Sequence, residues 1–201
     1  MTTTKTVVSL LAALAAGATA FAQTDVSTPV ESNGLLGQRY VEAGLGFIDV
    51  NNSRVDAFGA GLTVNLPVAP SFDVSADYAY SWVESFSEVD AHQITANGTY
   101  YIQAEQNLKT FARVSLGYAW ADWDNHATWG VSFGAEFQLA PQVVVTASAG
   151  YDDDFESGDN GAFDATVTGH YWFTRQVGAF AAVSYIEGGN YGLFGGVNVK
   201  F

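Results

Sequence analysis

The sequence contains no cysteine, and lysine and arginine together account for only 7 of its 201 residues. Without cysteine an exported chain has no disulfides, so its stability must come from packing and strand pairing. The 21 acidic residues give a formal net charge of −14. Nucleic acids and other anionic partners need the basic side chains that are scarce here, so we expect no nucleic-acid partner.

The chain also lacks a run of apolar residues long enough for a membrane-spanning helix, which needs about 20 residues. Its longest apolar run, residues 7–16, follows Lys5 and precedes the small residues Ala20 and Ala22, a pattern typical of a signal peptide and its cleavage site. We therefore interpret residues 1–22 as a cleaved signal peptide rather than a membrane anchor. The exported chain carries a net charge of −15, because Lys5 is lost, and would cross a membrane only as a β-barrel.

From Arg39 onward, apolar and polar residues alternate with the two-residue period of a β-strand. In the clearest segment, residues 72–83, apolar and aromatic side chains alternate with Asp73, Ser75 and Asp77. Each segment has roughly 9 to 12 residues, the length that a tilted strand needs to cross a bilayer. The ten segments are 39–48, 57–66, 72–83, 92–102, 110–120, 129–139, 143–151, 163–173, 177–186 and 191–201.

The sequence therefore predicts an all-β fold: a transmembrane antiparallel up-and-down β-barrel over residues 39–201, with ten strands and with eight as the alternative. Mostly short turns alternate with acidic loops, as expected for the periplasmic and outer ends of such a barrel. The polar residues 23–38 are expected to form a flexible periplasmic leader. A soluble barrel would alternate in the same way, but the second face of these strands is mostly Gly, Ser, Thr and Ala, which fill a core poorly.

Aromatic residues gather near both ends of the predicted strands, as expected at the two boundaries between lipid and water. Two such belts favour the membrane-spanning barrel over the soluble one. The belt beside the outer loops contains Tyr80, Trp82, Tyr118, Trp120, Trp129, Tyr151, Tyr185 and Tyr191. The belt beside the inner turns contains Phe72, Tyr100, Phe137, Tyr171, Phe173 and Phe201.

The chain ends on an aromatic residue, in the pattern Gly196-x-x-Val199-x-Phe201. This ending resembles the carboxyl-terminal signal by which bacterial outer-membrane barrels are recognised for assembly. From Arg39 onward, the chain resembles small outer-membrane barrels of the opacity-protein and OmpX-like type, sometimes grouped with porin-family proteins, with one hairpin more than the eight-stranded members. The resemblance implies the outer membrane of a Gram-negative-type bacterium. Outer-membrane lipid, lipopolysaccharide and the barrel-assembly machinery are the partners it implies; no cofactor is expected, and the oligomeric state stays open.

Seven charged or titratable residues fall on the predicted lumen face: Glu42, Asp73, Asp77, Arg113, Glu136, His170 and Lys200. Because charges inside a barrel are usually paired, we expect two ion pairs, Glu42 with Lys200 and Arg113 with Glu136. Such pairs either satisfy buried charge or gate the lumen, and the first is favoured. Small lumen residues are expected to leave room for water. Six aromatic residues point the same way and are placed to block it: Tyr40, Tyr101, Phe111, Trp172, Phe180 and Phe194.

The loop after residue 151 is the most acidic stretch of the chain. Asp152, Asp154, Glu156 and Asp159 offer oxygen ligands for Ca²⁺, but the glycine spacing does not match an EF-hand. A solvated acidic loop is favoured, with loose divalent-ion bridging to lipopolysaccharide as an intermediate case.

Catalysis is not expected. His126 and Thr128 faintly resemble the His-x-Ser of lipid A deacylases, but threonine replaces serine and the surrounding motif is absent.

Two functions fit the sequence. The first is a narrow, porin-like channel for ions or small solutes, for which acidic outer loops would concentrate cations at the mouth. The alternative is a non-conducting structural or surface-interaction barrel of adhesin-like kind. Short, non-repetitive loops identify no receptor for the alternative.

Overall fold

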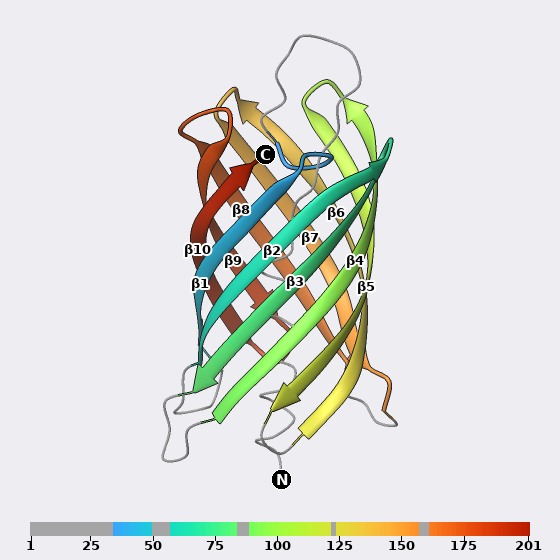
Figure 1. Ribbon diagram of the computed structural model, residues 1–201, viewed down its shortest axis with the longest axis vertical. Coiled ribbons are helices and arrows are strands. Elements are labelled where there is room, and N and C mark those ends of the chain that lie inside the picture. The colour runs from blue at the N-terminus through green and yellow to red at the C-terminus, as the bar shows by residue number, and fades with distance from the viewer. Residues whose placement is uncertain (1–33, 50–56, 84–88, 122–123, 157–160) are drawn as a thin grey trace.

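The computed structural model describes residues 34–49, 57–83, 89–121, 124–156 and 161–201, and within them the prediction of ten strands is confirmed. Each strand pairs antiparallel with its neighbours in the chain, and β1 pairs with β10 to close the barrel (Figure 1). The strands are β1 Tyr40–Asp49, β2 Ala57–Ala69, β3 Phe72–Val83, β4 Val89–Glu105, β5 Leu108–Ala121, β6 Asp124–Ala140, β7 Val143–Asp154, β8 Ala162–Trp172, β9 Val177–Ile186 and β10 Asn190–Lys200. Within the described ranges, no helix has the length and hydropathy needed to cross a membrane.

The bounds of β4 and β6 differ from those that the alternation predicts. Each has 17 residues, whereas the expected segments were 92–102 and 129–139. The added residues are largely polar, and backbone pairing does not require apolar side chains. Asp90 thus pairs with Trp82, and Asn125 pairs with Trp120.

Side-chain exposure shows which face of each strand points outward. Leu45, Val114 and Phe133 expose 67%, 61% and 65% of their surface, whereas Thr168 and Asn198 are fully buried. Apolar residues outside and polar residues inside are the reverse of a soluble barrel, and this arrangement fits an exterior in contact with lipid. The assignment of the two faces from the sequence is therefore confirmed.

The two ends of the barrel are distinguished by the chain direction. The turns after β2, β4, β6 and β8 lie at the end that holds the C-terminus, which is the upper end in Figure 1. We call this the inner end and the opposite one the outer end. An even number of strands places the start of β1 at the inner end as well. The residues that directly precede β1 therefore lie beside the inner mouth of the lumen.

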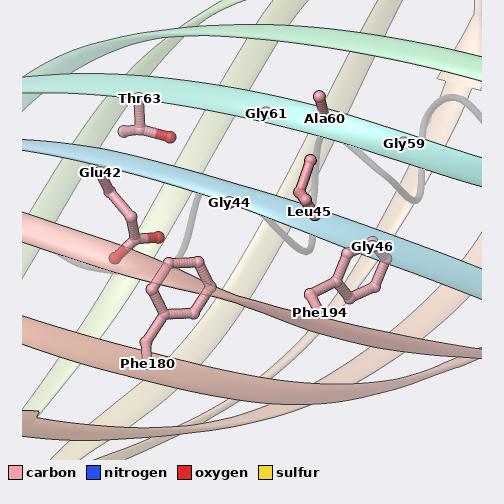
Figure 2. A pocket seen from close by; sticks show the side chains of 10 residues that line it. All are labelled: Glu42, Gly44, Leu45, Gly46, Gly59, Ala60, Gly61, Thr63, Phe180 and Phe194. Atoms are coloured by element: carbon pink, nitrogen blue, oxygen red, sulfur yellow. The ribbon is translucent and has the colours of Figure 1, made fainter.

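Aromatic rings, rather than water alone, occupy the space beside the lumen glycines. A Cβ atom on Gly46 would lie 2.1 Å from Cδ1 of Phe194, and one on Gly44 would lie 2.8 Å from Cζ of Phe180. Figure 2 shows both rings beside β1 in this part of the lumen. The rings thus take most of the space that these small residues leave, and a cavity of about 20 Å³ remains beside them.

Gly134 on β6 offers a test of this packing. A Cβ atom there would lie 2.4 Å from Cζ of Phe111 and 2.5 Å from the backbone oxygen of Ala147, whereas a Cβ on Gly169 would meet nothing within 4 Å. We expect Gly134→Ala to lower the free energy of unfolding by about 1–3 kcal/mol, because an overpacked ring and strand must shift. Gly169→Ala, the control, should change it by less than about 0.5 kcal/mol. Urea unfolding of vesicle-refolded protein measures both, and equal midpoints would contradict the packing argument.

Candidate functional site

The segment Gly34–Gln38, which we call the plug segment, lies inside the inner mouth of the barrel. Leu35 and Leu36 expose 0% and 1% of their surface. They pack into a cluster with four lumen side chains, Tyr40, Tyr101, Phe111 and Trp172. The expected flexible leader 23–38 is thus corrected for its last five residues, and residues 23–33 lie outside the described residues. The reason is physical: two adjacent leucines in a polar leader bury against aromatic rings at the nearest opening.

Carboxylates of the barrel wall hold the backbone of the plug segment. The backbone N–H of Leu35 donates to Oε2 of Glu136 at 2.8 Å, and that of Leu36 donates to the same oxygen at 3.4 Å. The N–H of Gly37 donates to Oδ2 of Asp73 at 2.9 Å. Where the acceptor is ionised, a bond of this kind is stronger than one between neutral groups. Two of the predicted lumen residues therefore act as acceptors for the plug segment.

Donors from the wall complete the site. The ammonium group of Lys109 donates to the carbonyl oxygen of Leu36 at 3.4 Å, and Nδ2 of Asn65 donates to that of Gln38 at 2.9 Å. Gly37 has a φ of 85°, a left-handed conformation that favours glycine and turns the chain at this point. Neither Lys109 nor Asn65 was singled out from the sequence. The available signal was the pair of adjacent leucines, Leu35 and Leu36, a few residues before β1.

Further from the inner mouth, polar side chains of different strands contact one another inside the lumen. Nε2 of His170 lies 3.3 Å from Oε2 of Glu42. On neighbouring strands, Nε of Arg113 donates to Oγ1 of Thr99 at 3.0 Å. Asn97 binds Asp77, and it also donates to Ser75 and accepts from Ser115. These contacts join several strands in the middle of the lumen.

The strand register bears on the two predicted ion pairs. Glu42 is opposite Asn198, and Lys200 is opposite Tyr40. The ammonium group of Lys200 lies 3.9 Å from the ring centre of Trp172. Glu136 is opposite Lys109, and Arg113 is opposite Ser132. The pairings of Glu42 with Lys200 and of Arg113 with Glu136 stay predictions. One described contact of Glu42 is with His170.

From its middle to its outer end, the lumen has an apolar wall and a polar wall. Phe180 and Phe194 form a buried cluster with Ile48, Ala57, Ala79, Ala182 and Ile186. A cavity of about 20 Å³ lies beside the two rings, with Glu42 and Thr63 in its lining (Figure 2), which is room for roughly one water molecule. On the other wall, Gln93, Thr95, His126 and Thr128 are buried polar residues.

The acidic loop is only partly described. Oδ1 of Asp154 accepts the N–H of Glu156 at 2.9 Å, and the Asp152 carboxylate lies beside Gly130 on the lumen side. Asp159 lies outside the described residues. In the described part of the chain, no three His, Asp or Glu side chains gather as a metal site. A Ca²⁺ site in this loop stays a prediction.

His126 and Thr128 both face the lumen from β6. Nδ1 of His126 lies 3.8 Å from a carboxylate oxygen of Asp124, and Thr128 lies 3.5 Å from Nε2 of Gln93. These contacts assign no reaction to the pair, and the expectation that the chain is not an enzyme stays a prediction.

Gly196 and Val199 of the predicted assembly signal lie on the closing strand β10, and Phe201 directly follows it. Val199 and Phe201 face outward, and Phe201 also donates its N–H to the carbonyl of Arg39 at 3.1 Å. Gly196 faces inward, where a Cβ would lie 2.0 Å from the backbone oxygen of Ala43. Recognition by assembly machinery stays a prediction. The predicted cleavage residues Ala20 and Ala22 lie outside the described residues.

Comparisons with known proteins find similarity in structure alone. A scan against protein-family models finds no match, and a search of curated proteins finds none either. The translocator domain of autotransporter NalP from Neisseria meningitidis is similar with a TM-score of 0.53 and 12% identity, over 99% of this chain and 98% of that one. The NanC porin is similar with a TM-score of 0.52 and 9% identity, over 80% and 100%.

At these identities the likeness shows the fold. The chain has the closed antiparallel fold of outer-membrane β-barrels, and the predicted fold class is confirmed. A barrel of ten strands also fits the resemblance to opacity-protein and OmpX-like barrels.

The hydrogen bonds from Leu35 and Leu36 to Glu136 lead to a prediction for amide hydrogen exchange. We expect Glu136→Ala to speed exchange of the Leu35 and Leu36 amide protons by about tenfold or more, because each loses its carboxylate acceptor. Gln138→Ala, two residues further along the same face, is the control and should leave both rates unchanged. Exchange followed by NMR in detergent micelles gives these rates. Identical rates in Glu136→Ala and the wild type would show that the plug segment is held by something else.

Proposed function

We propose that this protein is an outer-membrane barrel with a narrow polar lumen that the plug segment holds closed: a plugged channel for ions or small polar solutes. The observation that carries the proposal is the burial of Leu35 and Leu36 inside the lumen, with Glu136 bound to their backbone. This closure comes from a piece of chain outside the barrel wall. Such a piece can leave the lumen without any strand being lost.

The size and lining of the lumen support a channel. Eight strands make a barrel that its own side chains just fill, and ten strands enclose more space. Several buried lumen atoms have no hydrogen-bond partner among the described residues, including the hydroxyls of Thr95, Thr146 and Thr168. Buried polar groups are normally satisfied by protein or by ordered water. A hydrated lumen between the plug segment and the outer end is therefore favoured.

The charges in the lumen favour cations. Carboxylates of Glu42, Asp73, Asp77 and Glu136 are buried there, beside the bases Lys109, Arg113 and Lys200. An excess of acidic groups along a narrow path lowers the energy of a cation relative to an anion. The acidic loops at the outer end act in the same direction.

The alternative is a non-conducting structural or surface-interaction barrel. It is favoured by the rings of Phe180 and Phe194, which occupy space near the middle of the lumen. The two functions differ in what happens when the plug segment is removed.

The proposed location is the outer membrane of a Gram-negative-type bacterium, reached by way of the signal peptide 1–22. The apolar exterior of the barrel supports contact with lipid. Outer-membrane lipid, lipopolysaccharide and the barrel-assembly machinery are the proposed partners. We also propose that the protein needs no cofactor and catalyses no reaction.

Conductance in a planar bilayer tests the function. We expect mature protein, residues 23–201, to be mostly silent. A protein that begins at Arg39 and the full-length double variant Leu35→Asp/Leu36→Asp should both give steady, discrete, cation-preferring steps, because neither keeps an apolar plug in the lumen.

Gln138→Ala is the control for a lumen substitution and should stay as silent as the mature wild type. Folding is checked first by resistance to unfolding in detergent. Silence from both unplugged proteins, once shown to be folded, would reject the channel and leave the structural barrel.

A further inference from the structure

A continuous row of aromatic rings runs across the outward face of five strands near the outer end. Successive ring centres are 5.0 to 6.3 Å apart. We call this set the aromatic row. It consists of Phe47, Phe58, Trp82, Tyr80, His92, Trp120 and Tyr118.

His92 is the one member of the aromatic row that carries an imidazole, and it stands between two larger rings. Its ring is stacked on Trp120 with a centre distance of 5.3 Å and an interplanar angle of 12°, and it lies 5.0 Å from the ring centre of Tyr80. The Tyr78 hydroxyl lies 2.8 Å from Nδ1 of His92. This set of contacts fixes the orientation of the imidazole on the outside of the barrel.

The bond at Nδ1 determines what Nε2 offers. A phenol hydroxyl is a good donor and a neutral imidazole nitrogen is a good acceptor, so Tyr78 donates to Nδ1. The proton of the imidazole is then on Nε2, because the hydrogen bond made by one nitrogen sets the state of the other. Among the described residues Nε2 has no hydrogen-bond partner. His92 therefore presents a free N–H donor on the outer surface.

The aromatic row lies at the level of a lipid–water boundary. On β4, Tyr100 belongs to the inner belt and stands eight residues from His92. At a rise of about 3.4 Å per residue and a strand tilt of about 40°, this separation is roughly 20 Å across the bilayer. An apolar band of about 25 Å flanked by aromatic belts is typical of such barrels. His92 is thus near the headgroups of the outer leaflet.

The arrangement of the rings in the aromatic row determines whether it favours an anionic or a cationic ligand. Four of the neighbouring pairs are stacked, including His92 on Trp120, so part of each of these ring faces is covered and the ring edges are left for a ligand. The edge of an aromatic ring carries partial positive charge, and its face carries partial negative charge. Together with the Nε2–H of His92, these edges favour an anionic oxygen acceptor. The exposed Asp90, opposite Trp82, opposes such an anion, and water screens its charge.

We propose that His92 and the adjacent rings of Tyr80 and Trp120 bind the phosphate of an outer-leaflet lipid headgroup, with the Nε2–H as donor. This inference rests on the proposed location in the outer membrane. It is independent of whether the lumen conducts, because the site is on the opposite face of the wall.

Titration with a phosphate amphiphile tests the site. Mature protein is refolded in dodecyl maltoside micelles, which lack phosphate, and dodecyl phosphate is added. The indole N–H signal of Trp120 is followed by NMR. The wild type should show a saturable shift. His92→Phe keeps the stacking but removes the donor, and it should bind about tenfold more weakly.

Two further variants distinguish the alternatives. Tyr185→Phe removes a polar group from the Tyr185–Tyr191 pair of the outer belt on β9 and β10, and it should bind like the wild type. Asp90→Asn should tighten binding about twofold if the ligand is a phosphate, because a repelling charge is lost.

Equal affinities of the wild type and His92→Phe would overturn the proposal. Weaker binding by Asp90→Asn would also overturn it, because removing a negative charge cannot weaken the binding of an anion to a site that attracts it. Failure of the refolded protein to insert into lipid vesicles would instead refute the proposed location, so the two failures are distinguishable.

Discussion

Closure of the hydrogen-bond ladder between β1 and β10 is the constraint on which the rest of the structure depends. In lipid there is no water to satisfy an open strand edge, so all backbone groups must pair within the barrel. β1 and β10 pair from Tyr40 with Lys200 to Asp49 with Tyr191. Closure with an even number of strands brings both ends of the wall to one mouth. The position of the plug segment follows from this topology, because the residues before β1 have the inner mouth directly beside them.

The filling of the lumen depends on glycine as much as on large side chains. Phe180 lies where Gly44 and Gly196 lack a Cβ, and Phe111 lies against Gly134. A few aromatic rings, each packed against glycines, therefore fill much of the lumen. Phe111 also packs against the two leucines of the plug segment, and the ring of Phe180 lies 5.8 Å from that of His170. The shape of the remaining space is thus set by which strand positions have no side chain.

The alternation of residues predicted the strands and their faces because both properties repeat every two residues along one strand. Contacts between side chains inside the lumen do not follow from a pattern along one strand, because they join residues that are far apart in the sequence. Glu42 meets His170, 128 residues away in sequence, and the tilt of the strands decides which heights coincide. Leu35 and Leu36 have no periodic pattern of their own, and their acceptor Glu136 is about 100 residues further on. The pattern of single strands therefore does not predict the burial of the plug segment, although its two leucines are unusual in a polar leader.

The balance of forces on the plug segment explains why its carboxylate acceptors matter. Burying two leucine side chains contributes about 3–6 kcal/mol. Fixing the backbone of five residues costs about 5–10 kcal/mol. The cost exceeds the gain by about 2–4 kcal/mol, so burial of the leucines alone would leave the mouth open. The hydrogen bonds from Leu35 and Gly37 to Glu136 and Asp73 then decide the equilibrium. Without the plug segment, both carboxylates would take water as their partner, and the mouth would be lined by hydrated acids.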